Sequence, residues 1–297
     1  MSELQQPFFN GIDWSVMIND VEVILKPHET YSGISFEQIN FNSLNLFFCT
    51  FINCQFVACE LINTDCSHSN FNEVRFSECD MSNFVLIFGK LANCELSSCD
   101  LSLARINHAD MYQTKIWDCQ LTDTRIFATN INYSLLSDCS IDGLYFEDVI
   151  VFMSNLRNIS AISRPLRISR THFEKTNLIK VDAHHAKFVD VTWGSSSLIT
   201  CNFWKSVLKS VKFTSSKICS SGFNESKIID TLFVTTLVNA NRLRLVSFIY
   251  CVFERCDLIN SVMESADLST TIFDETHFAD NGLGGGADYP TIFPWEK

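Results

Sequence analysis

Apolar residues recur at every fifth position along two long stretches of the chain. The first stretch runs from Phe36 to Leu156 and the second from Ile168 to Phe278. A period of five matches neither the 3.6-residue period of an amphipathic helix nor the two-residue alternation of a half-buried strand. It fits a chain that turns a corner every five residues and points two of the five inward. The pattern therefore predicts an architecture of internal repeats.

Small side chains precede most of these apolar centres by two residues. Cys59, Thr124 and Ser216 are examples of this minus-two position. Between Leu156 and Ile168 the phase slips, because twelve residues separate these centres, two more than two repeats. We expect the centres to fill the axis of each stretch and the small residues to pack beside them.

The repeat resembles that of pentapeptide-repeat proteins, which is written as a small residue, Asp or Asn, Leu or Phe, and two free positions. The resemblance covers roughly residues 34 to 278 and implies an all-β fold, a right-handed quadrilateral β-helix in which four pentapeptides form one coil. Stacked strands lie about 4.8 Å apart, and the number of repeats implies about twelve coils in two phased stacks. The matching triplets include Cys99-Asp100-Leu101, Ser69-Asn70-Phe71, Ala109-Asp110-Met111 and Ala266-Asp267-Leu268.

The phase of the repeat divides the chain into five predicted segments. Because each coil contacts only its neighbours, both ends of the solenoid need caps. The C-terminal tail, rich in Gly and aromatic residues, either folds back over the last coil or binds a partner. The segments are an N-terminal cap (1–33), a first repeat stack (34–158), a phase break (159–167), a second repeat stack (168–278) and the tail (279–297).

Composition limits where the protein works. The sequence has no apolar run of 18 residues and no basic-then-apolar leader after Met1, so we expect neither a membrane span nor a secretory signal peptide. The expected compartment is the bacterial cytoplasm, or a host cell reached through an export signal that the sequence does not display.

The 13 cysteines fit a packing role. Most occupy minus-two positions and Cys66 a centre, so we expect small buried hydrophobes and no disulfide framework. Only Cys219 lies outside both positions. Residues twenty apart should stack, which would put Cys59, Cys79, Cys99, Cys119 and Cys139 in one column. Zinc needs ligands that converge tetrahedrally at about 2.3 Å, which parallel side chains one coil apart do not do.

No motif in the sequence predicts catalysis. The Gly-rich stretch 282–286 lacks the Lys and Ser or Thr of a phosphate-binding loop, and there is neither an HExxH motif nor a nucleophile elbow. The histidines His28, His68 and His108 are scattered in sequence, and we expect each on a solvated surface. We therefore predict a protein that is not an enzyme and has no catalytic, cofactor or metal site.

The formal net charge of −12 is unevenly distributed. Residues 1–158 carry 20 acidic and 7 basic side chains, residues 159–244 carry 5 and 13, and residues 245–297 carry 9 and 2. Fields of one sign can steer partners, although they also serve solubility alone. The candidate interaction surface comprises an acidic ridge of Glu60, Glu78, Asp80, Asp100, Asp118 and Asp138, a basic belt that includes Lys187, Lys205 and Lys227, and the tail residues Tyr289, Phe293 and Trp295.

Two functions follow as hypotheses. The first is a non-enzymatic protein-interaction rod, similar to the pentapeptide-repeat effectors that some Gram-negative bacteria deliver into host cells and directed at a protein partner. The alternative is a DNA mimic that inhibits or protects a type II topoisomerase such as gyrase. The acidic ridge favours the mimic, whereas the basic middle and the length of the chain speak against it. Direct binding of nucleic acid is not expected.

Overall fold

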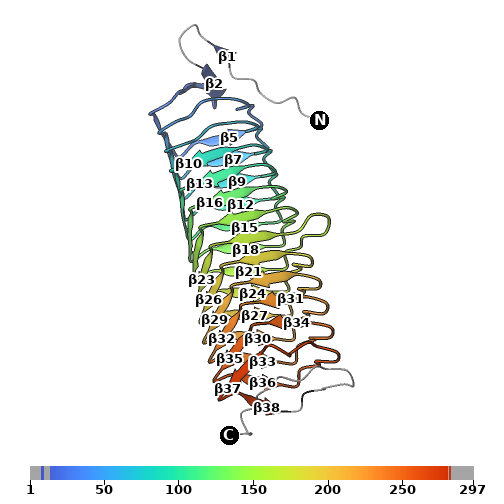
Figure 1. The fold of residues 1–297 in the computed structure, drawn as a ribbon. Helices are drawn as coiled ribbons and strands as arrows, with labels where there is room; N and C mark the ends of the chain where they lie inside the picture. Colours follow the sequence, from blue (N-terminus) through green and yellow to red (C-terminus); the bar gives the residue numbers. More distant parts are fainter. Residues whose placement is uncertain (1–7, 10–13, 280, 282–297) are drawn as a thin grey trace. The chain divides into compact units, whose positions relative to one another are not determined.

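The computed structural model describes residues 8–9, 14–279 and 281, and every regular element in these residues is a β-strand (Figure 1). In this part of the chain there is thus no helix that is long and apolar enough to cross a membrane. The chain forms two compact units, residues 1–145 and 146–297. Both consist of parallel strands stacked coil upon coil, which confirms the predicted right-handed quadrilateral β-helix of about twelve coils.

The first unit opens with a small antiparallel sheet. Its strands are β1 (Phe8–Phe9), β2 (Trp14–Ile18) and β3 (Val21–Leu25), in the order β1-β2-β3. The hydroxyl of Tyr31 accepts a hydrogen bond from the Lys26 amide at 3.0 Å and donates one to the Ile24 carbonyl at 2.9 Å. The Tyr31 ring meanwhile stacks on Phe51 at 5.0 Å. Tyr31 therefore joins the hairpin to the first coil, and strand pairing of the coils begins at Thr30.

Each coil has four faces, and in most coils three of these faces carry strands of three residues. We number the faces 1 to 4 in chain order from Ser35. Face 2 has isolated parallel bridges instead of strands, from Asn40 to Ser140 in the first unit and from Ser160 to Val262 in the second.

In the first unit, each strand pairs with the strand one coil further along. Leu96, for example, pairs with Phe76 and Ile116, so the register repeats every twenty residues. The strands are β5 (Ser35–Glu37), β7 (Gln55–Val57), β9 (Arg75–Ser77), β12 (Glu95–Ser97), β15 (Lys115–Trp117) and β18 (Leu135–Ser137) on face 1; β10 (Val85–Ile87), β13 (Arg105–Asn107) and β16 (Arg125–Phe127) on face 3; and β4 (Thr30–Ser32), β6 (Thr50–Ile52), β8 (Asn70–Asn72), β11 (Lys90–Ala92), β14 (Asp110–Tyr112) and β17 (Asn130–Asn132) on face 4.

The second unit repeats this arrangement, and β19 (Tyr145–Glu147) contains the boundary between the units. The strands are β21 (Asn155–Arg157), β24 (Asn177–Ile179), β27 (Ser197–Ile199), β30 (Lys217–Cys219), β33 (Leu237–Asn239), β36 (Asp257–Ile259) and β38 (His277–Ala279) on face 1; β22 (Arg167–Ser169), β25 (Lys187–Val189), β28 (Val207–Lys209), β31 (Lys227–Ile229) and β34 (Ser247–Ile249) on face 3; and β20 (Ile150–Phe152), β23 (His172–Glu174), β26 (Thr192–Gly194), β29 (Lys212–Thr214), β32 (Leu232–Val234), β35 (Val252–Glu254) and β37 (Ile272–Asp274) on face 4.

The phase slip is a coil of 22 residues inside the second unit. Ile150 pairs with His172, whereas Thr192 pairs with Lys212 at the usual spacing. The two extra residues lie between Ala161 and Leu166, which are both buried, while Ile162 between them is 71% exposed. The insertion is therefore absorbed at a corner, and the ladders on either side keep their register.

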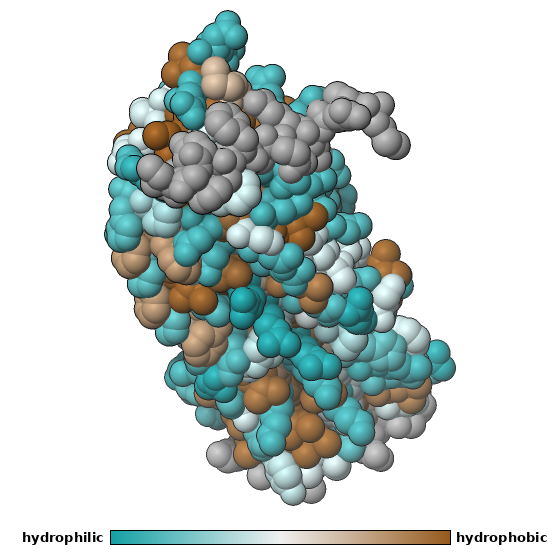
Figure 2. Space-filling view, turned by 90° about the horizontal axis from the view of Figure 1, so that it is seen from above, coloured by the Kyte–Doolittle hydropathy of each residue, from teal (hydrophilic) through white to brown (hydrophobic). Residues whose placement is uncertain are grey.

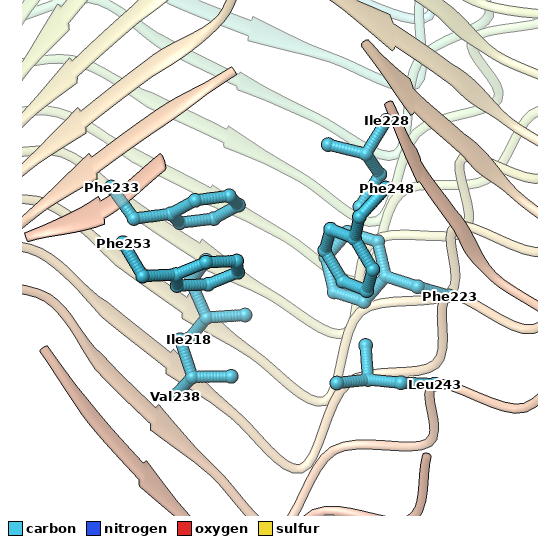
Figure 3. A pocket seen from close by; sticks show the side chains of 8 residues that line it. All are labelled: Ile218, Phe223, Ile228, Phe233, Val238, Leu243, Phe248 and Phe253. Atoms are coloured by element: carbon cyan, nitrogen blue, oxygen red, sulfur yellow. The ribbon is translucent and has the colours of Figure 1, made fainter. Parts of the chain in front are cut away.

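The predicted centres line the axis as stacked side chains. Phe213 is fully buried and stacks on Phe233 at 5.0 Å, and Phe233 stacks on Phe253 at 4.3 Å. Figure 3 shows Phe233 and Phe253 on one side of a small space, opposite Phe223 and Phe248, and only apolar side chains line it. A cavity without polar partners does not hold an ordered water. We therefore expect no ordered water in the axis between these coils.

Truncation of a stacked centre should destabilise the coils. Replacing Phe213 by Ala removes a buried ring and leaves a cavity between two neighbouring rings, so we expect a loss of about 3–5 kcal/mol in the free energy of unfolding. Lys212 on the same strand points outward and is exposed, and Lys212→Ala should change stability by less than about 0.5 kcal/mol. Urea unfolding followed by far-UV circular dichroism measures both; equal effects of the two variants would contradict the assigned packing.

Candidate functional site

The minus-two side chains satisfy buried backbone carbonyls. Thr64 Oγ1 donates to the Phe41 carbonyl at 2.8 Å, Thr124 Oγ1 to the Leu101 carbonyl at 2.7 Å, and Cys59 Sγ to that of Phe36 at 3.3 Å. In each case the acceptor belongs to a centre one coil earlier. Buried carbonyls need a donor, which explains why Cys, Ser and Thr prevail at these positions.

The column of five cysteines, Cys59 to Cys139, belongs to this packing. All five are buried, and the amides of Cys99 and Cys119 donate to the sulfurs of Cys119 and Cys139, each at 3.4 Å. Twelve of the thirteen cysteines are buried and Cys219 is partly exposed, as their repeat positions predict. Within the described residues, no group of His, Cys, Asp and Glu side chains could hold a metal ion.

Two of the six residues of the acidic ridge cap turns of face 2. Glu60, Asp80 and Asp100 occupy successive bridges of one column. Asp80 Oδ1 accepts the Ser82 amide at 3.0 Å, and Asp100 Oδ1 accepts the Ser102 amide at 2.8 Å. Carboxylates of Asp commonly accept the amide two residues later in this way. Asp80 and Asp100 therefore serve the fold directly, beside any role that they have at the surface.

The remaining acidic residues of the ridge lie at the corner before face 2. Glu78, Asp118 and Asp138 are exposed and have φ angles of 56°, 54° and 57°. Ser98 belongs to the same column, and its hydroxyl donates to Asp118 Oδ2 at 2.8 Å. Most corners of the coils use this left-handed conformation, which Asn and Asp tolerate better than most residues. The two columns are adjacent, as the sequence predicts.

The basic belt is partly neutralised by neighbouring side chains. Lys187 and Lys227 share an exposed column with Val207 between them. Lys205 lies over the Trp204 ring at 4.3 Å and pairs with Glu225 at 3.5 Å. A hydrogen bond from the Trp204 indole, with the charge of Lys205, holds the pKa of Glu225 below its usual value.

Binding of a partner by the acidic ridge or the basic belt is a proposal. The same holds for the candidate tail residues Tyr289, Phe293 and Trp295, which lie outside the described residues.

A stack of five exposed rings at the corner between faces 3 and 4 was not expected. The histidines that look scattered in sequence alternate with phenylalanines at a spacing of twenty, and adjacent ring planes deviate by 6–19° at centroid distances of 4.5–5.2 Å. The sequence signal is the recurrence of a ring two positions after a face 3 centre. We call this set the aromatic corner: His28, Phe48, His68, Phe88 and His108.

A cap prediction follows from the Asp80 geometry. Asp80→Ala removes the acceptor for the Ser82 amide and hydroxyl, so we expect a loss of about 1 kcal/mol in the free energy of unfolding. Asp80→Asn keeps an acceptor oxygen and relieves repulsion by the stacked Glu60 and Asp100, so its stability should equal or slightly exceed that of the wild type. Thermal unfolding compares them. A cap role would be refuted by an Asn variant as unstable as the Ala variant.

A second prediction concerns thiol reactivity. Burial raises the pKa of Cys94 to about 11 and the pKa of Cys201 to about 12, and it also raises the pKa of Cys66. The thiolate is the reactive form, so these cysteines should resist alkylation at pH 7.5. Cys219 is the most accessible, and Lys217 partly opposes the rise of its pKa. Mass spectrometry of iodoacetamide-treated native protein should find Cys219 modified first, whereas rapid labelling of most cysteines would contradict the burial.

Comparison with known proteins supports the assignment of the repeats. The family model of pentapeptide repeats matches residues 39–77, 49–86 and 79–118, with 8 copies. No curated protein matches the chain.

Three solved structures are similar at low identity. HetL, a pentapeptide-repeat protein involved in heterocyst differentiation regulation in the cyanobacterium Nostoc sp. strain PCC 7120, is 14% identical over 76% of this chain and 89% of its own, with a TM-score of 0.47. The plasmid-mediated fluoroquinolone resistance protein QnrB1 is 15% identical over 84% and 90%, with a TM-score of 0.22. The A-module of the mannuronan C-5 epimerase AlgE6 from Azotobacter vinelandii is 8% identical over 90% and 90%, with a TM-score of 0.31.

We draw no functional argument from these distant likenesses. The matched family model and the twenty-residue coils, each of four pentapeptides, both indicate a five-residue repeat. The chain belongs to the pentapeptide-repeat family.

Proposed function

We propose that the protein is a non-enzymatic interaction scaffold that binds a protein partner. The supporting observation is the exposure of large aromatic side chains at outward positions of well-ordered coils. Tyr112, Trp117 and Tyr133 in the first unit are 40–48% exposed, and Tyr112 and Tyr133 touch edge to face at 5.5 Å. Figure 2 shows hydrophobic residues at the surface in several separate patches among hydrophilic ones. Exposed apolar side chains that form a contiguous patch are typical of protein interaction sites.

The use of the polar residues supports a scaffold as well. Most hydroxyls and thiols of the minus-two positions donate to backbone carbonyls, as those of Thr64 and Cys59 do, and Asp80 and Asp100 cap turns. Such groups support the coils and leave the outward array of side chains as the variable part of the repeat. In a narrower form of the proposal, the protein is a bacterial effector that acts on a host protein. The degenerate, Phe- and Cys-rich repeats favour this form.

The stacking of Glu60, Asp80 and Asp100 in one column favours a second candidate, a DNA mimic directed at gyrase. Carboxylates at coil spacing would present a line of negative charge to a basic groove. Two of the three are engaged in turn caps, however, and Glu60 accepts hydrogen bonds from the side-chain amides of Asn40 and Asn42 at 3.1 and 2.7 Å. The column is thus explained in part by the needs of the fold.

A supercoiling assay separates the two candidates. We expect gyrase activity to be unchanged by a large excess of wild-type protein. The matched variant Glu60→Gln, Asp80→Asn, Asp100→Asn removes three charges while keeping every acceptor oxygen that caps a turn. Inhibition by the wild type that weakens with added salt and disappears in this neutral variant would favour the mimic over the scaffold.

Affinity capture tests the scaffold itself. Wild-type protein immobilised in host and bacterial lysates should retain a specific protein that a Tyr112→Ser, Trp117→Ser, Tyr133→Ser variant does not retain. All three side chains point outward, so circular dichroism should show the variant folded. Identical captured proteins for both forms would show that these three side chains do not contact the partner.

A further inference from the structure

The geometry points to a second surface: we propose that face 3 of the first unit, together with the aromatic corner, docks an acidic polypeptide segment that carries apolar side chains. This inference rests on the proposed scaffold function and specifies its surface and the chemistry of its partner. Three parallel rows make up the surface. They are a basic row of Arg105 and Arg125, a second row in which Asn107 lies between Ile87 and Phe127, and the aromatic corner.

The basic row destabilises the folded state, because two adjacent positive charges repel each other. Arg105 and Arg125 are direct neighbours on β13 and β16 and both are exposed. Like charges directly opposite on neighbouring strands destabilise a sheet. Neither arginine forms an ion pair with any residue in the described part of the chain. A carboxylate brought by a partner would relieve this repulsion.

The aromatic corner is unusual in two ways. Phe48 and Phe88 have φ angles of 57° and 56°, a left-handed conformation that is uncommon for bulky residues. They nevertheless remain 48% and 53% exposed. Stacking between the rings offsets part of the backbone cost, but it leaves apolar edges in water. Coverage by apolar side chains of a partner would remove those edges from solvent.

Ring orientation decides which partner fits. His68 lies between Phe48 at 4.5 Å and Phe88 at 5.2 Å, so both of its faces are covered. The stack therefore offers ring edges instead of faces, and a nucleobase finds no face on which to stack within it. Ring edges carry partial positive charge, and imidazole N–H groups donate hydrogen bonds. Carboxylates, backbone carbonyls and aliphatic side chains complement such a surface.

The charges around this surface are mixed, because Asp65, Asp110 and Asp123 lie near the cations Arg105, Arg125 and Lys90. Lys90 follows the corner and is exposed. Of the carboxylates nearby, Asp65 accepts hydrogen bonds from the amide and hydroxyl of Ser67 at 3.0 and 2.6 Å, and Asp110 accepts one from the side-chain amide of Asn130 at 2.8 Å. These carboxylates have partners in the fold, whereas the two arginines have none among the described residues. The two adjacent arginines, which form no ion pair among the described residues, therefore favour an acidic occupant over a basic one.

Peptide binding tests the inference. The probe is a fluorescent twelve-residue peptide that alternates Glu with Leu and Phe; its control replaces each Glu by Lys. Fluorescence anisotropy with full-length protein should show binding of the acidic peptide at least tenfold tighter than that of the control. Phe48→Ser with Phe88→Ser should weaken binding at least tenfold. Arg105→Ala with Arg125→Ala should weaken it at low salt and flatten its salt dependence.

The matched control variant is Lys115→Ala, which removes an exposed positive charge from face 1 of the same unit and should bind the peptide like the wild type. The inference is overturned if the acidic peptide does not bind, or if the face 3 variants bind it as tightly as the wild type does. It is also overturned if a single-stranded oligonucleotide binds this face more tightly, or if sedimentation shows a dimer that Phe48→Ser with Phe88→Ser dissociates. If lysate capture finds a partner whose binding these variants do not change, the scaffold function is supported but the proposed docking surface is wrong. If lysate capture finds no partner, the scaffold function itself is wrong.

Discussion

The parallel backbone ladder that joins residues twenty apart is the constraint on which the other features depend. It fixes which side chains stack, so a centre meets a centre, a minus-two residue meets a minus-two residue and a corner residue meets a corner residue. Phe233 therefore meets Phe253, and Cys99 meets Cys119. It also brings each minus-two donor within reach of a carbonyl one coil earlier. A change of register would break all of these contacts together.

The sequence allowed the fold to be predicted because these contacts impose a strict period. The centre positions, the burial of the cysteines and the two extra residues near Pro165 could all be read from it, since one shift in phase is visible against so many regular repeats. The role of Asp80 could not be read. An Asp before a centre is compatible with a surface charge and with a turn cap, and only the position of the Ser82 amide distinguishes the two.

The aromatic corner escaped prediction for a different reason. His28, His68 and His108 appear isolated when each is judged by its neighbours in sequence, because the residues that they touch are twenty positions away. Free positions of the repeat carry no packing requirement, so nothing in the period demands a ring there. Their significance appears only when the column, instead of the pentapeptide, is taken as the unit of comparison.

Columns also indicate which surfaces serve the fold and which do not. In the column of Glu60, Asp80 and Asp100, neighbouring like charges are offset by hydrogen bonds within the coils. In the column of Arg105 and Arg125 no such compensation occurs among the described residues, and the adjacent phenylalanines add a backbone cost and exposed apolar edges. Local features that oppose stability persist in proteins mainly where another role maintains them. The second column, and not the first, is therefore the one whose composition calls for a partner.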